Sequence, residues 1–182
     1  MKTDSKISIK RARESDVDKF YPFFEKSVKT QFPPYSNLIT DYFLEEEYPK
    51  DYLKESIRNK NKFLYIANVD KQIAGYLLTN KNYGGISYAT WFAVFPKFQK
   101  KGIASSLLLE WEKDVAKHGG HKLYLWTVKR NLEFYKKRGF TQGGFIPDAW
   151  FGKTTRYMFY KTLAKSDEKK FLKEFIKKKK GR

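Results

Sequence analysis

Two apolar segments separated by only two residues occupy the centre of this 182-residue chain. Residues 63–69 and 72–78 are rich in aromatic, branched and other apolar side chains, and Asp70 and Lys71 between them have the length of a two-residue hairpin turn. Residues 86–95 repeat this strand-forming composition. The centre of the chain therefore predicts consecutive strands of one sheet, and the remaining helices and strands have to pack around that sheet.

Helical patterns and further strands lie on both sides of this centre, recognised by apolar periods of about 3.6 and 2 residues. The expected elements are a strand at 7–13, a helix beginning at 14–16 and ending at Pro33 and Pro34, a helical stretch at 38–58 broken near Pro49, strands at 63–69, 72–78 and 86–95, a helix at 102–117, a strand at 122–128, a short helix between Asn131 and Gly139, and strands at 140–145 and 155–163. The order β-α-α-β-β-β-α-β-α-β-β predicts an α/β domain with a mixed, mostly antiparallel sheet flanked by helices.

The composition is that of a folded domain with a basic extension. Apolar residues make up 41% of the chain and aromatic residues 18%, too much for a disordered chain. We expect a domain at residues 1–164 and a basic amphipathic C-terminal tail at 165–182. The apolar face of this tail consists of Phe171, Leu172, Phe175 and Ile176. We expect the tail to dock on the domain or to fray, rather than to bind a membrane surface or nucleic acid.

The net charge is strongly positive. Lys and Arg number 38 and Asp and Glu 20, so the formal charge is +18. The tail contributes eight lysines and one arginine against three acidic residues, a net +6. Such a charge suits nucleic acid, a membrane surface or an anionic cofactor, and the charge alone does not choose among them.

Several kinds of site are excluded or unsupported. The chain has no cysteine, which removes disulfides, thiolate metal sites and a cysteine nucleophile. His118 and His121 flank two glycines without further ligands, so we expect no metal site. Pro147 occupies the position where a nucleotide-binding loop ending at Gly152 would need a glycine. Neither a signal-peptide pattern nor a long apolar run is present, which predicts a cytoplasmic protein without a membrane span.

The most informative stretch is a strand that passes through a turn into a helix. The strand ends near Phe95, and the helix begins at Gly102, with Ala104 two residues later. A helix N-terminus presents unpaired N–H groups and a positive dipole end, and small side chains let an anion approach the backbone. Lys100 and Lys101 add positive charge. The pattern fits a diphosphate site, and it also fits an ordinary strand–turn–helix connection.

Four short motifs in the right order resemble the GCN5-related N-acetyltransferase (GNAT) superfamily. Residues 99–104 are similar to its Q/R-x-x-G-x-G/A signature, and residues 92–94 fall where its strand pairs with the pantetheine arm. Residues 7–16 resemble its opening strand and following Asp, and residues 134–140 resemble its F-Y-x-K-x-G-F segment. The order of elements also matches, so the resemblance covers residues 7–164.

The resemblance implies a GNAT-like fold and an acyl-CoA-dependent N-acyltransferase that moves an acetyl group from acetyl-CoA to an amine by direct attack, without a metal. Tyr135 is the implied proton donor to the departing thiolate, a step that such chemistry needs; packing on the sheet is the alternative role for this ring. The implied cofactor-binding residues are Phe92, Ala93, Val94, Gln99, Lys100, Lys101, Gly102, Ile103, Ala104 and Ser105.

Two features depart from the family pattern. Members often carry an Asn about seven residues before the tyrosine, where this chain has Val128; Asn131 is more simply the N-cap of a short helix. Some relatives use a strand glutamate as general base, but that strand offers Tyr88 and Thr90 here. A water chain or Asp148 is left for this role, and Asp148 beside a proline is more simply a turn residue.

The acceptor is either a small-molecule amine or a protein lysine or N-terminus. The acidic cluster Glu45, Glu46 and Glu47 lies in the region that covers the acceptor site in the family, and it either attracts a cationic amine or forms a solvated helix face. Aromatic residues that line this site or belong to the core are Tyr35, Tyr42, Tyr88, Trp91 and Trp150. The resemblance also implies a homodimer through the last strands. The rival functions are a non-catalytic CoA-binding protein of the same fold and a basic nucleic-acid-binding protein.

Overall fold

A computed structural model describes residues 7–32, 35–149 and 154–180 of the chain. Their strands form one mixed sheet in the order β1-β2-β3-β4-β5-β7-β6. Neighbouring strands are antiparallel except β4 and β5, which are parallel and are joined by a helical crossover. The strands are β1 (Ile7–Arg11), β2 (Lys62–Val69), β3 (Gln72–Asn80), β4 (Ile86–Val94), β5 (Lys122–Thr127), β6 (Thr141–Ala149) and β7 (Thr154–Thr162).

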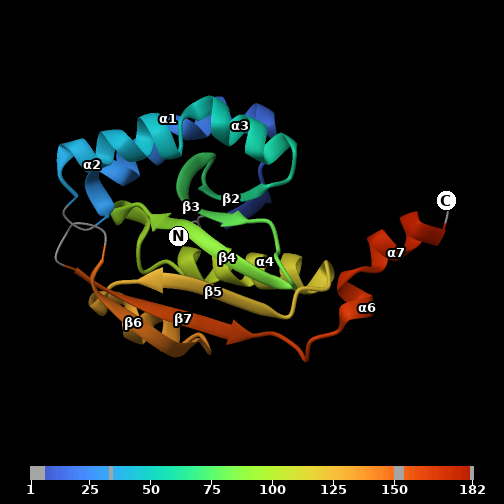
Figure 1. Ribbon diagram of the computed structural model, residues 1–182. Coiled ribbons are helices and arrows are strands. Elements are labelled where there is room, and N and C mark those ends of the chain that lie inside the picture. The colour runs from blue at the N-terminus through green and yellow to red at the C-terminus, as the bar shows by residue number, and fades with distance from the viewer. Residues whose placement is uncertain (1–6, 33–34, 150–153, 181–182) are drawn as a thin grey trace, which may run out of the picture.

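Helices cover both faces of the sheet (Figure 1). Phe20 of the first helix packs edge-on against Tyr76 of β3, with ring centroids 5.0 Å apart. Tyr65 of β2 pairs with Leu77 of β3, and Leu77 points to the opposite face of the sheet from its neighbour Tyr76. On that opposite face the Tyr65 hydroxyl contacts Asp114 of the crossover helix. The helices are η1 (Glu14–Asp16), α1 (Val17–Gln31), α2 (Asn37–Tyr42), η2 (Phe43–Glu47), α3 (Lys50–Arg58), η3 (Pro96–Phe98), α4 (Ile103–Lys117), η4 (Lys129–Asn131), α5 (Leu132–Lys136), α6 (Glu168–Phe171) and α7 (Lys173–Lys180).

The fold and element order predicted from the sequence are confirmed for the described residues. Asp70 and Lys71 have φ values of 48° and 66°, which the tight hairpin between β2 and β3 requires. The helical region predicted at 38–58 is broken at Pro49 and is divided further into α2, the π-helical η2 and α3. Strand β6 extends to Ala149, beyond its predicted end at residue 145.

Some predictions concern residues outside the described part of the chain. These residues are Pro33 and Pro34 at the predicted helix end, Trp150 as a candidate acceptor-site aromatic, and Gly152 in the rejected nucleotide loop.

Strand β4 contains a bulge at Thr90. Leu78 of β3 pairs with Trp91, and the next residue, Thr79, pairs with Ala89, so Thr90 is an extra residue in β4. Its hydroxyl donates a hydrogen bond to the Leu78 carbonyl at 3.0 Å. The extra residue reverses the alternation of side chains along β4. An even-numbered residue before the bulge and an even-numbered residue after it therefore point to opposite faces of the sheet.

Strands β4 and β5 diverge at this bulge. Their parallel pairing ends where Ala89 faces Leu125, whereas β4 continues to Val94 and stays paired with β3. The second half of β4 therefore has one backbone edge that β5 does not use. This divergence opens the sheet between α1 and η2 on one face and α4 and α5 on the other.

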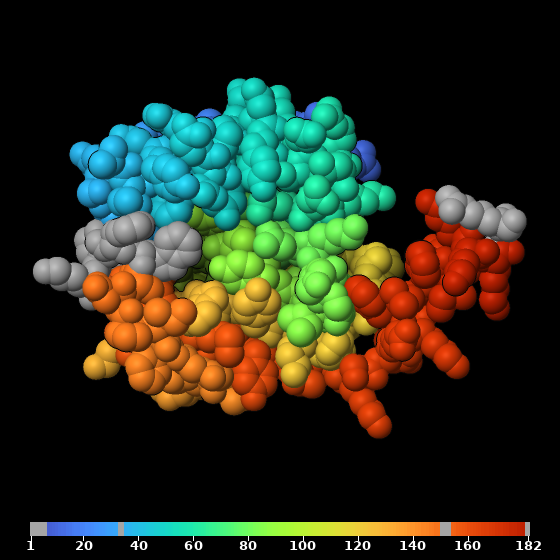
Figure 2. All heavy atoms as spheres, viewed as in Figure 1, coloured from blue at the N-terminus to red at the C-terminus, as the bar shows by residue number. Residues whose placement is uncertain are grey.

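The basic tail forms α6 and α7, which project from the rest of the molecule (Figures 1 and 2). Lys170 and Phe171 pack on the Gly119 turn at the end of α4, where a Cβ on Gly119 would lie 2.8 Å from the Phe171 Cα. Phe175 is 60% exposed. Within the described residues, no helix combines the length and the apolar content needed to cross a membrane.

Candidate active site

A cavity of about 900 Å³ lies where β4 and β5 diverge. Its walls come from β4, the N-terminal turn of α4, the β5–α5 connection, α1, η2 and one residue of β7. The predicted cofactor-binding residues that line it are Phe92, Ala93, Val94, Gln99, Lys100, Gly102, Ile103, Ala104 and Ser105. Lys101 does not line it, and its Nζ lies 5.9 Å from the centre of the Phe98 ring.

The N-terminus of α4 forms one end of the cavity. Gly102 precedes the helix with φ 79° and ψ −8°, a left-handed conformation that favours glycine. The first helical hydrogen bond runs from the Ser106 N–H to the Gly102 carbonyl at 3.0 Å. The N–H groups of Ile103, Ala104 and Ser105 lie before it in the first turn, without intrahelical acceptors, so the sequence-predicted turn presents donors suited to a phosphate.

Strand β4 supplies a second set of backbone groups. Ala93 pairs with Tyr76 of β3 on one side, and β5 has already turned away on the other. The Gln99 side chain reaches back over this edge, where its Nε2 donates to the Val94 carbonyl at 3.0 Å. The unused edge of β4 thus leads directly towards the N-terminus of α4.

Arg138 brings positive charge to the same end of the cavity. Its guanidinium donates from Nε to the Ser105 Oγ at 3.0 Å and from Nη2 at 2.6 Å, and from Nη1 to the Phe134 carbonyl at 2.8 Å. The guanidinium carbon also lies 3.7 Å from the centre of the Phe134 ring. These contacts fix α5 to the first turn of α4, a role that sequence reasoning missed.

Tyr135 of α5 lines the cavity from the side of α4. The side chain is 6% exposed and packs against Phe140 and Phe159, with ring centroids 5.6 and 5.9 Å away. Burial raises the pKa of the Tyr135 hydroxyl, while a hydrogen bond to the Thr127 side chain opposes this increase. The phenol is therefore protonated at neutral pH.

Asn131 is the N-cap residue of α5, as the sequence predicted, but its side chain makes no capping hydrogen bond. Instead, its Nδ2 donates to the Thr127 Oγ1 at 3.1 Å, and the residue lines the cavity, as Val128 does. Asn131 and Tyr135 therefore share Thr127 as a partner.

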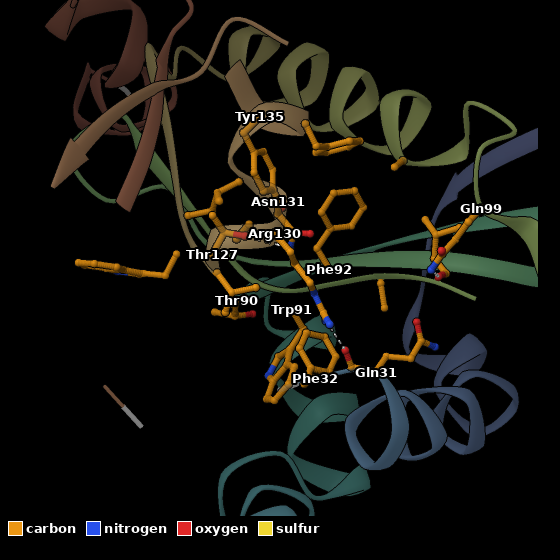
Figure 3. A pocket seen from close by; sticks show the side chains of 18 of the residues that line it. Gln31, Phe32, Thr90, Trp91, Phe92, Gln99, Thr127, Arg130, Asn131 and Tyr135 are labelled. Atoms are coloured by element: carbon orange, nitrogen blue, oxygen red, sulfur yellow. Dashed lines mark hydrogen bonds between the residues drawn. The ribbon is translucent and has the colours of Figure 1, made fainter. Parts of the chain in front are cut away.

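The opposite wall is aromatic. Trp91 follows the bulge in β4 and packs edge-on against Phe32 at 4.7 Å, Phe43 at 5.5 Å and Tyr48 at 5.5 Å between ring centroids. Figure 3 shows Trp91 and Phe32 on the side of α1, whereas Phe92 and Tyr135 point into the cavity from the other side. The predicted aromatics Tyr35, Tyr88 and Trp91 line this wall, and Tyr42 does not.

Glu47 is the one member of the predicted acidic cluster that lines the cavity. Its Oε1 accepts a hydrogen bond from the Tyr42 hydroxyl at 2.7 Å. All three glutamates are exposed, as expected for a solvated helix face. Among the described lining residues, Glu47 supplies the only carboxylate.

Two arginines line the cavity, one just after the C-terminal end of β5 and one near the N-terminal end of β7. Arg130 of η4 reaches across to α1, where its Nη2 donates to the Gln31 carbonyl at 3.1 Å (Figure 3). Arg156 of β7 is 9% exposed, and its Nη2 donates to the Tyr35 hydroxyl. The Arg156 Nε is buried without a hydrogen-bond partner. Neither arginine belongs to a recognisable sequence motif.

The sequence matches a known protein family over most of its length. Residues 26–140 fit the acetyltransferase (GNAT) family. The chain belongs to this family. No match is found among curated proteins.

Solved structures support the GNAT fold. PaiA N-acetyltransferase from Thermoplasma acidophilum, in complex with coenzyme A, is 22% identical with a TM-score of 0.69, covering 86% of this chain and 99% of that one. The protein yncA from Salmonella typhimurium, solved with its cofactor acetyl-CoA, is 16% identical with a TM-score of 0.70, covering 90% of this chain and 97% of that one. The ribosomal-protein-S18-alanine N-acetyltransferase from Escherichia coli is 15% identical with a TM-score of 0.67, also covering 90% and 97%. At these identities the likeness establishes the fold and not the substrate.

Two candidates from the sequence lie away from the GNAT cavity. Asp148 is exposed in an irregular part of β6 with φ 47°, which fits the turn role rather than that of a base. His118 lies 3.1 Å from Asp114 at the end of α4, and the described residues contain no group of three or more potential metal-ligating side chains.

Proposed function

We propose that this GNAT-family protein is an N-acetyltransferase that moves an acetyl group from acetyl-CoA to an amine. The observation that carries the proposal is the continuity between the unused edge of β4 and the free N–H groups of α4 within one cavity. The edge suits the amides of a pantetheine arm, and the helix turn suits a diphosphate.

The residues of the cavity fit coenzyme A chemically. Gly102 has no side chain to cover the helix N-terminus, and open space surrounds its Cα. Lys100 lines the cavity, and Arg138 is held on Ser105 in the first turn of α4. We assign the diphosphate to the N–H groups of residues 102–105, with Arg138 and Lys100 as cationic neighbours.

We assign the proton donor to Tyr135. Acetyl-CoA, when bound, supplies the activated acyl thioester. Tyr135 Oη holds a proton at neutral pH because burial raises its pKa, so it is in the form needed to protonate a departing thiolate. Asn131 and Tyr135 both contact Thr127, which keeps the phenol orientated.

The acceptor amine is assigned to the aromatic half of the cavity. Glu47 attracts the ammonium form electrostatically. The ammonium loses one proton to solvent water, and the neutral amine then attacks the acyl carbon at the bulge in β4, where the two halves of the cavity join. As the C–S bond breaks, Tyr135 protonates the thiolate, and the second proton given up by the nitrogen restores the phenol.

Amine-dependent release of CoA thiol from acetyl-CoA, measured over a panel of amines, amino acids and peptides, tests this assignment. Tyr135→Phe should lower kcat by about 100-fold, the scale of general acid catalysis, with unchanged acetyl-CoA affinity. Tyr83→Phe is the matched control, because Tyr83 is 90% exposed and outside the cavity.

The outcomes separate the alternatives. Equal turnover in Tyr135→Phe and wild type would remove Tyr135 as the acid. Binding of acetyl-CoA with no amine-dependent release across the panel would instead favour the non-catalytic CoA-binding protein.

A further inference from the structure

We propose that the acceptor is an amino acid whose carboxylate is bound by Arg156, so that this arginine selects the substrate. The inference rests on the proposed acetyltransferase function and adds the chemical class of the acceptor. Its basis is a buried cation in the aromatic half of the cavity, for which the described residues supply no carboxylate counter-ion.

Among the residues that the structure describes, none supplies a carboxylate partner for the charge of Arg156, whose guanidinium carbon lies 5.9 Å from the centre of the Tyr35 ring. Arg156 is 9% exposed, and in the described part of the chain no carboxylate lies within 4.0 Å of its guanidinium nitrogens. Its hydrogen bond to the Tyr35 hydroxyl uses one of five N–H groups, and its Nε is buried without a partner. Burying an unpaired charge is costly, so an unpaired guanidinium at the wall of a cavity points to an anionic ligand.

Arg156 faces the acceptor side of the sheet. Tyr157, the next residue of β7, pairs with Thr127 of β5, and Phe159 on the same face packs against Tyr135. Side chains alternate along a strand, so Arg156 points to the opposite face, where it meets Tyr35. The guanidinium is thus placed with Tyr35 and Tyr88.

The surroundings of Arg156 favour a carboxylate. A guanidinium offers paired, coplanar N–H groups that match the two oxygens of a carboxylate. Burial raises the pKa of Tyr35 and Tyr48 and raises that of Tyr88 to about 12, so their hydroxyls are protonated and can donate to an anion. All three line the cavity beside Arg156.

The same half of the cavity also carries a negative group. Glu47 lines the cavity on the side of η2, whereas Arg156 lies on β7. A ligand between them meets a carboxylate and a guanidinium, which is the charge pattern complementary to a zwitterion. An amino acid, with an ammonium and a carboxylate in one small molecule, fits this pattern.

The experiment compares matched acceptors. The twenty L-amino acids, their amides, the corresponding amines without the carboxylate and phosphoethanolamine are offered with acetyl-CoA, and CoA release is followed. We expect at least one amino acid to be acetylated with kcat/KM about 10-fold or more above its amide. Arg156→Gln should lower this kcat/KM by about 10- to 100-fold and lower that of the amide by a smaller factor, because a neutral carbonyl accepts a weaker hydrogen bond from a guanidinium than a carboxylate does.

Controls isolate the role of Arg156. Arg58→Gln makes the same charge change on the exposed surface of α3, outside the cavity, and should behave as wild type. Arg156→Lys keeps the charge but not the planar fork, so it should recover only part of the preference. Calorimetric titration with acetyl-CoA reports whether each variant keeps a folded cofactor site, and the comparison of acids with amides in the wild type holds even if Arg156→Gln does not fold.

Four results would overturn the inference while leaving the proposed function standing. The first is that amides or decarboxylated amines react as well as the amino acids, and the second is that phosphoethanolamine is preferred over them. The third is that no amino acid in the panel reacts although other amines do, and the fourth is an equal loss for acids and amides in a folded Arg156→Gln protein. Failure to bind acetyl-CoA would reject the proposed function first.

Discussion

Lys62, the first residue of β2, is a cation held largely out of water. It is 7% exposed, its Nζ donates to the Asn80 Oδ1 at 2.8 Å, and it lies 5.1 Å from the centre of the Tyr48 ring. Burial lowers its pKa to about 8, while the charge of Glu47 opposes this decrease. The folded protein therefore releases this proton at a lower pH than the unfolded chain.

This difference predicts how stability depends on pH. Between about pH 8 and the usual lysine value near 10.5, the unfolded chain holds the Lys62 proton and the folded one does not. The Lys62 contribution to the free energy of unfolding therefore rises with pH in this window, by at most about 3 kcal/mol, and it is flat below pH 8. Near pH 10 the buried tyrosines act in the opposite direction, because burial raises their pKa and only the unfolded chain ionises there. Urea unfolding at pH 7.5 and 9 should therefore show a more positive change in the free energy of unfolding for wild type and the exposed control Lys19→Met than for Lys62→Met. A parallel response of all three proteins would contradict the account.

At the residue scale, motif residues were predictable and isolated charges were not. Gly102 and Tyr135 sit in short patterns whose spacing fixes their place beside a strand or helix end. Arg138, Arg130 and Arg156 are single cations in a chain rich in lysine and arginine. Their roles depend on which faces β7 and the β5–α5 connection present, and this is settled only by tertiary pairing.

At the scale of elements, β4 is positioned by a close approach to β3. Gly75 of β3 lies so near β4 that a Cβ there would come within 2.7 Å of the Ala93 carbonyl oxygen and 3.0 Å of the Val94 Cγ2. Both neighbours belong to the half of β4 that lines the cavity. The absence of a side chain at Gly75 thus permits the pairing that holds this edge in place.

Gly75→Ala should therefore destabilise the protein by about 1–3 kcal/mol, because the contact is with backbone that must shift. Gly144→Ala is the matched control in another strand, since nothing lies within 4 Å of the added Cβ. Chemical denaturation should show a loss only for the first variant. Equal stabilities of the two variants would mean that β3 and β4 tolerate the side chain.

The strands and helices themselves were largely predictable, because apolar periodicity and turn residues mark them. The bulge at Thr90 was not predicted: residues 86–95 read as one continuous strand, and the extra residue appears only when β4 is paired with β3. The point at which β4 leaves β5 was likewise invisible, because it depends on pairing between segments separated by α4. These two features create the cavity.

At the scale of the whole molecule, the basic tail touches the domain at the Gly119 turn, away from the cavity. Ending the chain after Ala164 removes α6, α7 and a net charge of +6. We expect acetyl-CoA affinity to change less than about twofold and the Tm to fall by a few degrees, since about 1 kcal/mol of packing is lost. A large loss of acetyl-CoA affinity would show that the tail, and not only α4, serves the cofactor.

The central claim is that the N-terminus of α4 binds the diphosphate of acetyl-CoA. Calorimetric titration of wild type, Gly102→Asp and Gly84→Asp tests it most directly. Both glycines have positive φ, 79° at Gly102 and 56° at Gly84, and open space around a built Cβ, so both variants carry a strained backbone and the same added charge. We predict affinity in the micromolar range for wild type and Gly84→Asp, and a loss of at least about 10-fold for Gly102→Asp, whose carboxylate would face the phosphates. Absence of binding by wild type, or equal affinities of the two variants, would contradict the account.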